Sequence, residues 1–345
     1  MDDKKIRNME EFAQATGISR PTVAKYFNDP ASVRQTTRDR IEAALLEHDY
    51  RPSIFAVNLN KKNPKNIGVV VPHISDPFYA EIVRQIEISA LQEGYWAIVL
   101  SSHGDRQLET NAIQTLLSLK LSGAVIAPLG YESDLRLIQN LRTSMPLVFM
   151  DSRIEDETPF VGTDNLQSMS LMVDYLCRSG EPPCYLSMPL VNRNAVERKE
   201  AYRSSMVRLG KEPIIIDMPI KTWDFEAVGF EETMRILAHR GFPTRTVLCA
   251  NDRLAFGVMA AMYQSGLRVG REAGCDMRVA GHDDHPLSRY ACPALTTVAQ
   301  DYNQIAKASL ATLLHMIDRT SPRQNKTLDQ TTTLLEAKLI MRESA

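Results

Sequence analysis

The stretch MEEFAQATGISRPTVAKYFN, residues 9–28, decides the fold of the N-terminal part of this chain. Two short helical patterns lie on either side of Gly17, which permits a sharp turn because it carries no Cβ. Ser19 is a favoured N-cap, and Pro21 falls in the first turn of the second pattern, where its missing N–H costs little. The apolar residues of the two patterns are Met9, Phe12, Ala13, Val23, Tyr26 and Phe27. Helix, glycine turn and helix predict a helix-turn-helix, whose second helix lies in the major groove of DNA.

The charge of this segment separates that interpretation from an ordinary corner between two helices of a small bundle. From Ile18 to Arg40 there are five cations and two anions, a local charge of +3, whereas the whole chain carries a net charge of −2. The cations are Arg20, Lys25, Arg34, Arg38 and Arg40, and the anions are Asp29 and Asp39. A basic element on a near-neutral protein indicates local contact with DNA.

Length and composition limit the remaining classes of protein. A chain of 345 residues is too long for one typical domain. It has no run of about 18 apolar residues, so no membrane span is expected. Its polar start, MDDKKIRNMEE, has no apolar signal-peptide core. The cysteines form no CxxC pair, which predicts reduced thiols in a cytoplasmic protein; they are Cys177, Cys184, Cys249, Cys275 and Cys292.

The segment GHDDH, residues 281–285, could be taken for a metal cluster, because His282 and His285 flank Asp283 and Asp284. Consecutive residues at the end of a strand point in alternating directions, so they rarely converge on one ion. No metal site is therefore expected.

A third helix is predicted after the polar turn at 28–30, over roughly 36–48, with its apolar residues packed on the first two. Pro52 follows, so the DNA-binding domain is expected to end there. Residues 53–60, SIFAVNLN, are compatible with a helix that is too short to be stable alone. Residues 61–66 have the composition of a linker.

From residue 66 onward, apolar runs alternate with amphipathic helical patterns. The expected strands are 67–72, 96–102, 123–128, 146–151, 184–189, 213–218, 246–252 and 278–284. Strands that are apolar on both faces and separated by helices predict a parallel, doubly wound sheet, and two such units in tandem form two lobes with a cleft. The sequence has no GxGxxG after the first strand, no GxSxG and no P-loop, so it predicts neither an enzyme nor a bound cofactor.

Together these segments resemble the LacI/GalR family of bacterial transcription regulators, over nearly the whole chain. Besides the headpiece, the motifs that carry the resemblance are IGVVVPHISDPFYAEI (67–82), CANDRLAFG (249–257), GHDD (281–284) and PALTTVAQD (293–301). The resemblance implies an N-terminal all-α helix-turn-helix headpiece, a hinge helix, and an α/β periplasmic-binding-protein-like sensor domain of two doubly wound lobes.

The resemblance also implies domain boundaries. The DNA-binding domain is 1–52, the hinge helix and linker are 53–65, and the effector-binding and dimerisation domain is 66–345. Within the last, the N-lobe is expected over about 66–163 and 294–325, and the C-lobe over about 164–293 and 326–343.

By the same resemblance, the recognition helix begins with Ser19, Arg20, Pro21 and Thr22 and includes Lys25. Arg20 and Lys25 can donate to O6 and N7 of guanine. The groups that would contact phosphates or cap helices are Asn8, Ser19, Thr22, Asn28 and Thr37. Pro21 and Ala24 depart from the family pattern, which leaves the base preference open.

The hinge segment is expected to contact DNA through Ser53, Ala56 and Leu59. Leu59 matches the family's hinge leucine, which wedges into the minor groove at the operator centre and kinks the DNA. Such a hinge would become ordered only on specific DNA.

The family's effector lies between the lobes. The matching positions here are Phe78, Tyr79, Asp151, Asn192, Arg198, Trp223, Asn251 and Asp283. Strand carboxyl ends are where open α/β sheets bind ligands. An aromatic face surrounded by Asp, Asn and Arg suits a polyhydroxyl ligand. The resemblance also favours a sugar over a nucleobase, because Asn192 stands where some nucleobase-binding members of the family carry arginine. Asp224 is an alternative to Trp223, because the alignment there is ambiguous by one residue.

The sequence thus predicts a cytoplasmic homodimeric repressor that binds double-stranded DNA at a pseudo-palindromic operator and is released by a small sugar. One alternative is a regulator that needs a corepressor, such as a purine. Another, of a different class, is a solute-binding receptor, against which the headpiece and the missing signal peptide argue.

Overall fold

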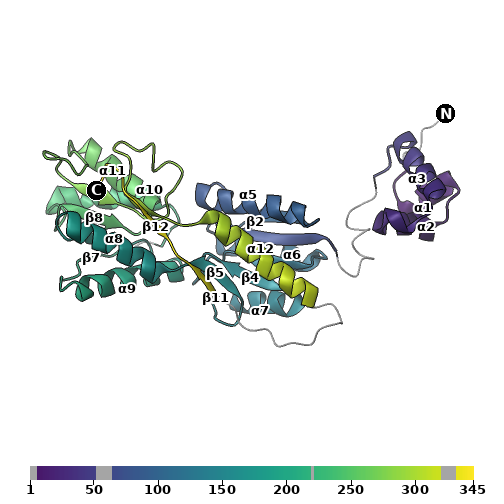
Figure 1. Ribbon diagram of the computed structural model, residues 1–345, viewed down its shortest axis with the longest axis horizontal. Helices are drawn as coiled ribbons and strands as arrows, with labels where there is room; N and C mark the ends of the chain where they lie inside the picture. The colour runs from purple at the N-terminus through teal and green to yellow at the C-terminus, as the bar shows by residue number, and fades with distance from the viewer. Residues whose placement is uncertain (1–5, 52–63, 219–220, 320–331) are drawn as a thin grey trace. The chain divides into compact units, whose positions relative to one another are not determined.

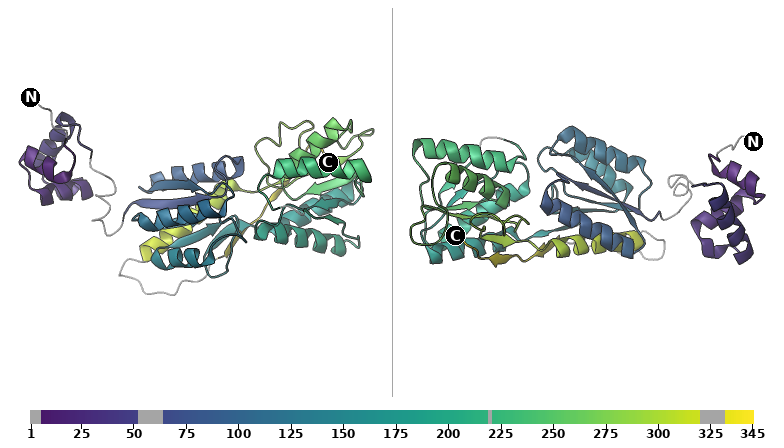
Figure 2. Two further views of the ribbon diagram at one scale, coloured as in Figure 1. Left: turned by 180° about the vertical axis from the view of Figure 1, so that it is seen from behind. Right: turned by 90° about the horizontal axis from the view of Figure 1, so that it is seen from above.

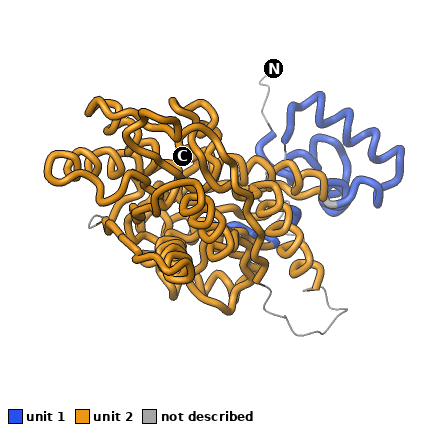
Figure 3. Tube along the Cα trace, turned by 60° about the vertical axis from the view of Figure 1, so that its left-hand side comes forward, with its two compact units in different colours: residues 1–65, 118–122 blue, residues 66–117, 123–345 orange. Residues whose placement is uncertain are grey.

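The computed structural model describes residues 6–51, 64–218, 221–319 and 332–345. The chain divides into two compact units, one of residues 1–65 with 118–122, and one of residues 66–117 with 123–345 (Figure 3). The predicted hinge contacts of Ser53, Ala56 and Leu59 lie outside the described residues.

The N-terminal unit is a small helical domain. Its elements are α1 Met9–Thr16, α2 Arg20–Asn28, the 3-10 turn η1 Pro30–Ser32, and α3 Gln35–Glu47. Phe12 is fully buried at its centre, and its ring stacks on that of Tyr50 with centroids 4.7 Å apart. Gly17 caps α1 with φ +62°, and its N–H donates to the Ala13 carbonyl, which makes the turn that leads into α2. The predicted helix-turn-helix is confirmed.

The N-caps of α1 and α2 differ from each other. Asn8 caps α1 because its side chain accepts a hydrogen bond from the Glu11 N–H at 2.9 Å. Ser19 lies at the N-cap of α2 but makes no such bond. Its hydroxyl is instead paired with that of Thr22 at 2.8 Å. Only the position of Ser19, not a side-chain cap, matches the sequence prediction.

The first lobe of the larger unit is built on a six-stranded parallel sheet in the order β11-β5-β4-β3-β1-β2. The strands are β1 Asn66–Val71, β2 Trp96–Ser101, β3 Gly123–Ile126, β4 Leu147–Met150, β5 Phe160–Thr163 and β11 Thr332–Leu335. The helices are α5 Pro77–Gln92, α6 Arg106–Ser118, α7 Leu135–Ser144 and α12 Tyr302–Arg319. Helices α5 and α12 lie side by side and bury Ile67, Val69 and Val71 of β1, which point to one face because side chains alternate along a strand (Figure 1).

The second lobe repeats this plan with a four-stranded parallel sheet in the order β7-β6-β8-β9. Its elements are β6 Cys184–Leu186, β7 Ile215–Ile216, β8 Thr246–Cys249, β9 Arg278–Ala280, α8 Asn165–Ser179, α9 Arg193–Arg208, α10 Phe225–His239 and α11 Asp252–Gln264. Helix α8 packs on α9, and α10 packs on α11. In the views of Figure 2, the sheet of each lobe has helices on both faces. The predicted doubly wound lobes are confirmed.

The C-terminal part of the chain is shared between the lobes differently from the prediction. Strand β11 pairs with β5 of the first sheet, although 326–343 was assigned to the C-lobe. Strand β10, Thr297–Ala299, was assigned to the N-lobe but pairs with β12, Lys338–Ile340, and places Val298 in the core of the second lobe. The chain therefore crosses between the lobes after β5, after β10 and after β11. These short segments carry too little periodicity to assign them to a sheet from sequence alone.

Two further expectations from the sequence concern the cysteines and membrane-spanning helices. All five cysteines are free thiols. Among the described helices, none is long and apolar enough to cross a membrane.

Helices α10 and α11 approach so closely that only glycine fits between them. A Cβ on Gly257 would collide with the Glu226 carbonyl and lie 2.6 Å from the Phe230 nitrogen. A Cβ on Gly229 would collide with the Leu254 carbonyl. The backbones of the two helices are therefore in direct contact at these residues.

We expect Gly257→Ala to destabilise the second lobe by about 1–3 kcal/mol, because the added methyl must push α10 and α11 apart. Thermal unfolding of the variant and the parent chain measures this change. The control is Ala260→Ser, at an exposed position of α11. Equal unfolding temperatures for Gly257→Ala and the parent would show that the helices can separate at no cost.

Candidate functional site

The structure brings all eight predicted effector residues into one cavity between the lobes, here called the inner cavity. Its lining contains Phe78, Tyr79, Asp151, Asn192, Arg198, Trp223, Asn251 and Asp283. It also contains residues that the sequence did not point to, namely Asp76, Met188, Asn194, Phe225, Arg253 and Gln300. Strand ends and helix starts of both lobes supply these side chains, as expected for open α/β sheets.

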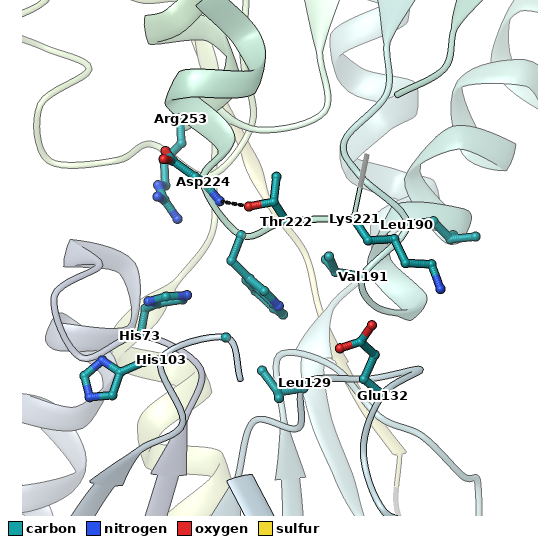
Figure 4. Close-up of a pocket in the computed structure, with 12 residues that line it drawn as sticks. His73, His103, Leu129, Glu132, Leu190, Val191, Lys221, Thr222, Asp224 and Arg253 are labelled. Atoms are coloured by element: carbon teal, nitrogen blue, oxygen red, sulfur yellow. Dashed lines mark hydrogen bonds between the residues drawn. The ribbon is translucent and has the colours of Figure 1, made fainter. Parts of the chain in front are cut away.

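A second, outer cavity, drawn in Figure 4, shares part of its lining with the first. It is lined by His73, His103, Gly104, Leu129, Glu132, Leu190, Val191, Lys221, Thr222, Trp223, Asp224 and Arg253. Trp223 and Arg253 line both cavities. The inner cavity has a volume of about 40 Å³ and the outer one a volume of about 450 Å³. Asp224, the alternative to Trp223, faces only the outer cavity.

Arg198 is the buried cation of the inner cavity, with a side chain that is only 4% exposed. Its Nε donates to Asn165 Oδ1 at 3.0 Å, and its Nη1 donates to the Ala250 carbonyl at 2.9 Å. Its Nη2 lies 3.0 Å from Asp283 Oδ1. Burial disfavours the cation, but Asp283 and Asp151 outweigh it and raise the pKa of Arg198. One N–H on each Nη atom remains for a ligand.

Asp283 faces Arg198 with one oxygen and leaves the other open. Its Oδ1 pairs with the Arg198 guanidinium, accepts a hydrogen bond from the Gln300 amide at 2.7 Å, and lies 2.9 Å from Nδ1 of the His282 ring. Its Oδ2 has no hydrogen-bond partner among the described residues. Burial tends to raise the pKa of Asp283, but Arg198 and His282 outweigh it and lower the pKa, so the carboxylate is ionised. An open oxygen on a fixed carboxylate suits the O–H group of a ligand.

Ser168, His282 and Asp283 are connected like the members of a hydrolytic triad. The Ser168 hydroxyl lies 2.9 Å from His282 Nε2, and His282 Nδ1 lies 2.9 Å from Asp283 Oδ1. Ser168 and His282 are fully buried, so no substrate reaches the hydroxyl. Burial and the charge of Arg198 lower the pKa of His282 to about 4, which keeps the ring neutral. The arrangement orients Asp283 rather than activating a nucleophile.

Asp151 is held by two neighbours. Its Oδ2 accepts the Tyr79 hydroxyl at 2.8 Å, and its Oδ1 accepts the Asn194 amide at 3.2 Å. Burial raises the pKa of Asp151 to about 6, although Arg198 and the Tyr79 hydrogen bond oppose this. Its backbone has φ +62°, which is uncommon for a residue with a side chain.

The two asparagines and the two aromatic residues complete the predicted set. Asn192 caps α9 and Asn251 caps α11, through Ala195 N–H and Leu254 N–H. Both are buried, and Asn192 keeps its amide N–H groups for another partner, since the described residues supply none. Phe78 packs edge-on against Tyr79 and Tyr302, so most of its ring is core. Trp223 lies between His73 and Phe225, with centroids 5.8 Å from each.

An ion pair between the lobes was missed by the sequence analysis. Arg253 on α11 donates through Nη1 to Asp76, the N-cap of α5, at 3.2 Å. Its Nε and Nη2 grip the Glu226 carboxylate at 2.7 and 2.6 Å. The sequence Asp76-Pro77 is typical of an N-cap followed by the first residue of a helix, so the start of α5 could be predicted. Nothing in the local sequence indicates that Arg253 is the ion-pair partner of Asp76.

The lobes also meet where glycines allow it. A Cβ on Gly104 would lie 2.8 Å from Trp223 Cδ1, and a Cβ on Gly130 would lie 2.7 Å from Asn192 Cα. Next to Gly130, the Tyr131 N–H donates to the Val191 carbonyl at 3.2 Å. Both glycines have positive φ, so a larger residue would be strained as well as crowded.

The histidines and aspartates of GHDDH each have partners other than a metal. Asp284 pairs with Arg342 at 2.6 Å, and His285 Nδ1 accepts the Leu287 N–H at 3.1 Å. Within the described ranges, no three His, Cys, Asp or Glu side chains are placed to hold a metal ion.

In the N-terminal domain, the predicted base-reading side chains point to solvent. Arg20 is 65% exposed and pairs with Glu10 at 3.4 Å. Lys25 is exposed as well, as are Asn8, Ser19 and Pro21, whereas Thr22 and Thr37 are half-buried. The side chain of Asn28 lies outside the description.

Comparison with known proteins places both parts of the chain in one family. Residues 8–53 match the family described as bacterial regulatory proteins, lacI family, and residues 64–284 match periplasmic binding proteins and sugar binding domain of LacI family. The chain belongs to the LacI family. It is a DNA-binding transcriptional regulator with a ligand-binding domain, as the sequence predicted.

Relatives in the LacI family cover the chain almost from end to end. The ribose operon repressor of Escherichia coli K12 is 29% identical over 333 residues, which are 96% of this chain and 99% of the relative. The repressor CytR of the same organism is 28% identical over 343 residues, 97% and 95% of the two chains. The lac repressor dimer bound to operator and the anti-inducer ONPF is similar in structure, with a TM-score of 0.79 at 28% identity over 99% of each chain.

The raised pKa of Asp151 predicts that ionisation of this carboxyl lowers the stability of the folded chain as the pH rises. Folding favours the protonated carboxyl, so the contribution to stability is present below the unfolded pKa of about 3.9 and is lost as the pH rises through about 6. Asp151→Asn stays neutral. Its unfolding temperature should therefore rise relative to the parent chain between pH 4.5 and pH 7. Asp134→Asn, at the cap of α7, is the control, and a parallel rise in that variant would contradict the assignment.

Proposed function

We propose that this LacI-family protein is a repressor whose binding to an operator is relieved by a small sugar held between the lobes. The inner cavity carries the proposal, because it gathers all eight residues expected to bind the effector. The name of the similar ribose operon repressor and the sugar-binding description of the matched family support a sugar.

The chemistry of the inner cavity fits hydroxyl groups. The open Oδ2 of Asp283 accepts an O–H, while the remaining N–H groups of Arg198 and Asn192 donate to ligand oxygens. Trp223 offers an apolar ring to the C–H face of a sugar. Asp151 and Asn251 line the same cavity and supply further polar atoms.

DNA would be read by the exposed side of α2. We assign Arg20 and Lys25 to contacts with guanine, and Asn8, Ser19, Thr22 and Thr37 to phosphate contacts that set the register. Pro21 begins the recognition helix. Asn28 and the hinge residues Ser53, Ala56 and Leu59 are assigned to DNA contacts by resemblance alone.

The active form would be a homodimer on a pseudo-palindromic operator. Ile88 and Leu91 on α5 are 44% and 55% exposed, and Trp96 at the start of β2 is 67% exposed. Apolar side chains gathered next to an edge strand are the surface that a second copy would cover. The solved lac repressor structure is described as a dimer bound to operator, which supports this assembly.

We assign residues 1–52 to the DNA-binding domain, 53–65 to the hinge and 66–345 to the sensor, with the crossing of β10 and β11 as described above. We place the protein in the cytoplasm, where its DNA is, and assign it no enzymatic activity, cofactor or metal. A solute receptor would share the two lobes but would not need a basic helix-turn-helix.

The first test measures binding of the purified protein to its own upstream DNA at fixed salt, alone and with mono- and disaccharides or purines. Release of the DNA by one sugar is the expected result. DNA binding that occurs only after a small molecule is added would mean that the ligand promotes DNA binding, and would favour a corepressor. Failure to bind DNA in all conditions would overturn the proposal.

A variant shows whether the sugar acts through the inner cavity. Asn192→Ser keeps a side chain that can cap α9 but removes the amide N–H groups. We expect unchanged DNA affinity and an increase of about tenfold in the sugar concentration for half release, the value of one hydrogen bond. Asn140→Ser on the exposed side of α7 is the matched control.

Arg20→Ala tests the reading of bases. If Arg20 contacts guanine, operator affinity falls by about 1–3 kcal/mol, while binding to unrelated DNA falls much less. Titrations of both DNAs at one salt concentration give the two losses. An equal loss on both would reduce Arg20 to a phosphate contact. Arg136→Ala, exposed on α7, is the control outside the DNA-binding domain.

A further inference from the structure

The charged groups that line the inner cavity carry an excess of negative charge. Two arginines, Arg198 and Arg253, face three aspartates, Asp76, Asp151 and Asp283. The outer cavity adds no positive excess, because Lys221 and Arg253 are balanced by Glu132 and Asp224.

Neither arginine offers an anion an unpaired positive charge, because each is already paired with carboxylates of the protein. The fork of Arg253 already holds the two oxygens of Glu226, and its third nitrogen holds Asp76. Arg198 has one nitrogen on Asp283 and the other two on Asn165 and the Ala250 carbonyl. A phosphate or carboxylate would have to displace a carboxylate of the protein to reach the fork of Arg253, and on the remaining N–H groups of Arg198 it would lie beside the Asp283 carboxylate.

The helix starts around the cavities are occupied too. Free N–H groups at a helix start are the usual site for a phosphate. Here the first turns of α5, α9, α10 and α11 are capped by their own side chains, Asp76, Asn192, Asp224 and Asn251. Two of these caps, Asp76 and Asp224, are negatively charged, so they offset the positive end of the helix dipole that would otherwise attract an anion.

The open groups include the N–H donors of Arg198 and Asn192 as well as acceptors, a mixture that suits the hydroxyl groups of an uncharged ligand. Asp283 Oδ2 has no partner among the described residues and accepts a hydroxyl. His73 Nε2 at the outer cavity is buried, and the described part of the chain gives it no hydrogen-bond partner. Burial and the charge of Arg253 lower the pKa of His73, so the ring is neutral and contributes a hydrogen bond rather than a charge.

We infer that the effector is a polyhydroxyl compound without a phosphate or carboxylate group. The inference rests on the proposed sugar-responsive function and narrows it, because it excludes sugar phosphates and sugar acids. A hydroxyl donor satisfies the open oxygen of Asp283, whereas an added anion would meet the three carboxylates Asp76, Asp151 and Asp283 in a partly dry cleft.

Matched pairs of ligands test this inference on the full-length protein. Calorimetric titration compares D-ribose with D-ribose 5-phosphate, D-glucose with D-glucose 6-phosphate, and D-galactose with D-galacturonate. For any pair that binds, we expect the neutral member to bind at least about tenfold more tightly. An anionic member that binds as tightly as its neutral partner would overturn the inference. If no member of any pair binds, the sugar assignment itself fails, which is a different result.

A pair of variants tests the electrostatic reason. Asp76→Asn keeps a side chain that can cap α5 but removes the charge that holds Arg253, so the preference for the neutral member should shrink several-fold. Asp134→Asn makes the same change at the cap of α7, outside both cavities, and should leave the preference unaltered. An unchanged preference in Asp76→Asn would show that shape rather than charge excludes the anion, and would overturn the argument.

Discussion

The buried charge of Arg198 is the constraint on which the cleft depends. A guanidinium with 4% exposure must be paired and hydrogen-bonded, because an unpaired buried charge is strongly destabilising. Its three partners come from separate segments: Asn165 begins α8, Ala250 follows β8, and Asp283 follows β9. Satisfying one cation therefore fixes the start of α8 relative to the ends of β8 and β9 in the second lobe.

The hydrogen bonds of Asp283 connect this network to the segments that join the lobes. Gln300, between β10 and α12, donates to Asp283 and accepts from Thr163 at the end of β5. A ligand that engages Asp283 thus contacts a carboxylate tied to two of the three crossings between the lobes. Any coupling between such a ligand and DNA must be reciprocal, so the operator also changes the affinity for the ligand.

The sequence predicted the helix-turn-helix and the two doubly wound lobes because long periodic segments have unambiguous patterns. The eight cleft residues could be named from motif resemblance, although their roles stay predictions. The Arg253–Asp76 pair could not be foreseen, because 177 positions separate the partners and only the approach of the lobes joins them. Strand β11 was assigned to the wrong lobe because four residues carry no signal for the sheet that accepts them.

Backbone strain at the cleft has a consequence for how a ligand acts. Asp151, Asp283 and Asp284 have φ values of +62°, +123° and +52°, conformations that cost of order 1–3 kcal/mol at non-glycine residues. Their hydrogen bonds to Asn194, Gln300 and Arg342, all side chains of the protein, hold them there. The carboxylates are therefore oriented by the protein's own side chains, so a ligand need not spend binding energy on arranging them. A ligand shifts the equilibrium between two arrangements of the lobes only by the difference between its binding free energies for the two. Binding energy that is not used for orienting the carboxylates can contribute to that difference.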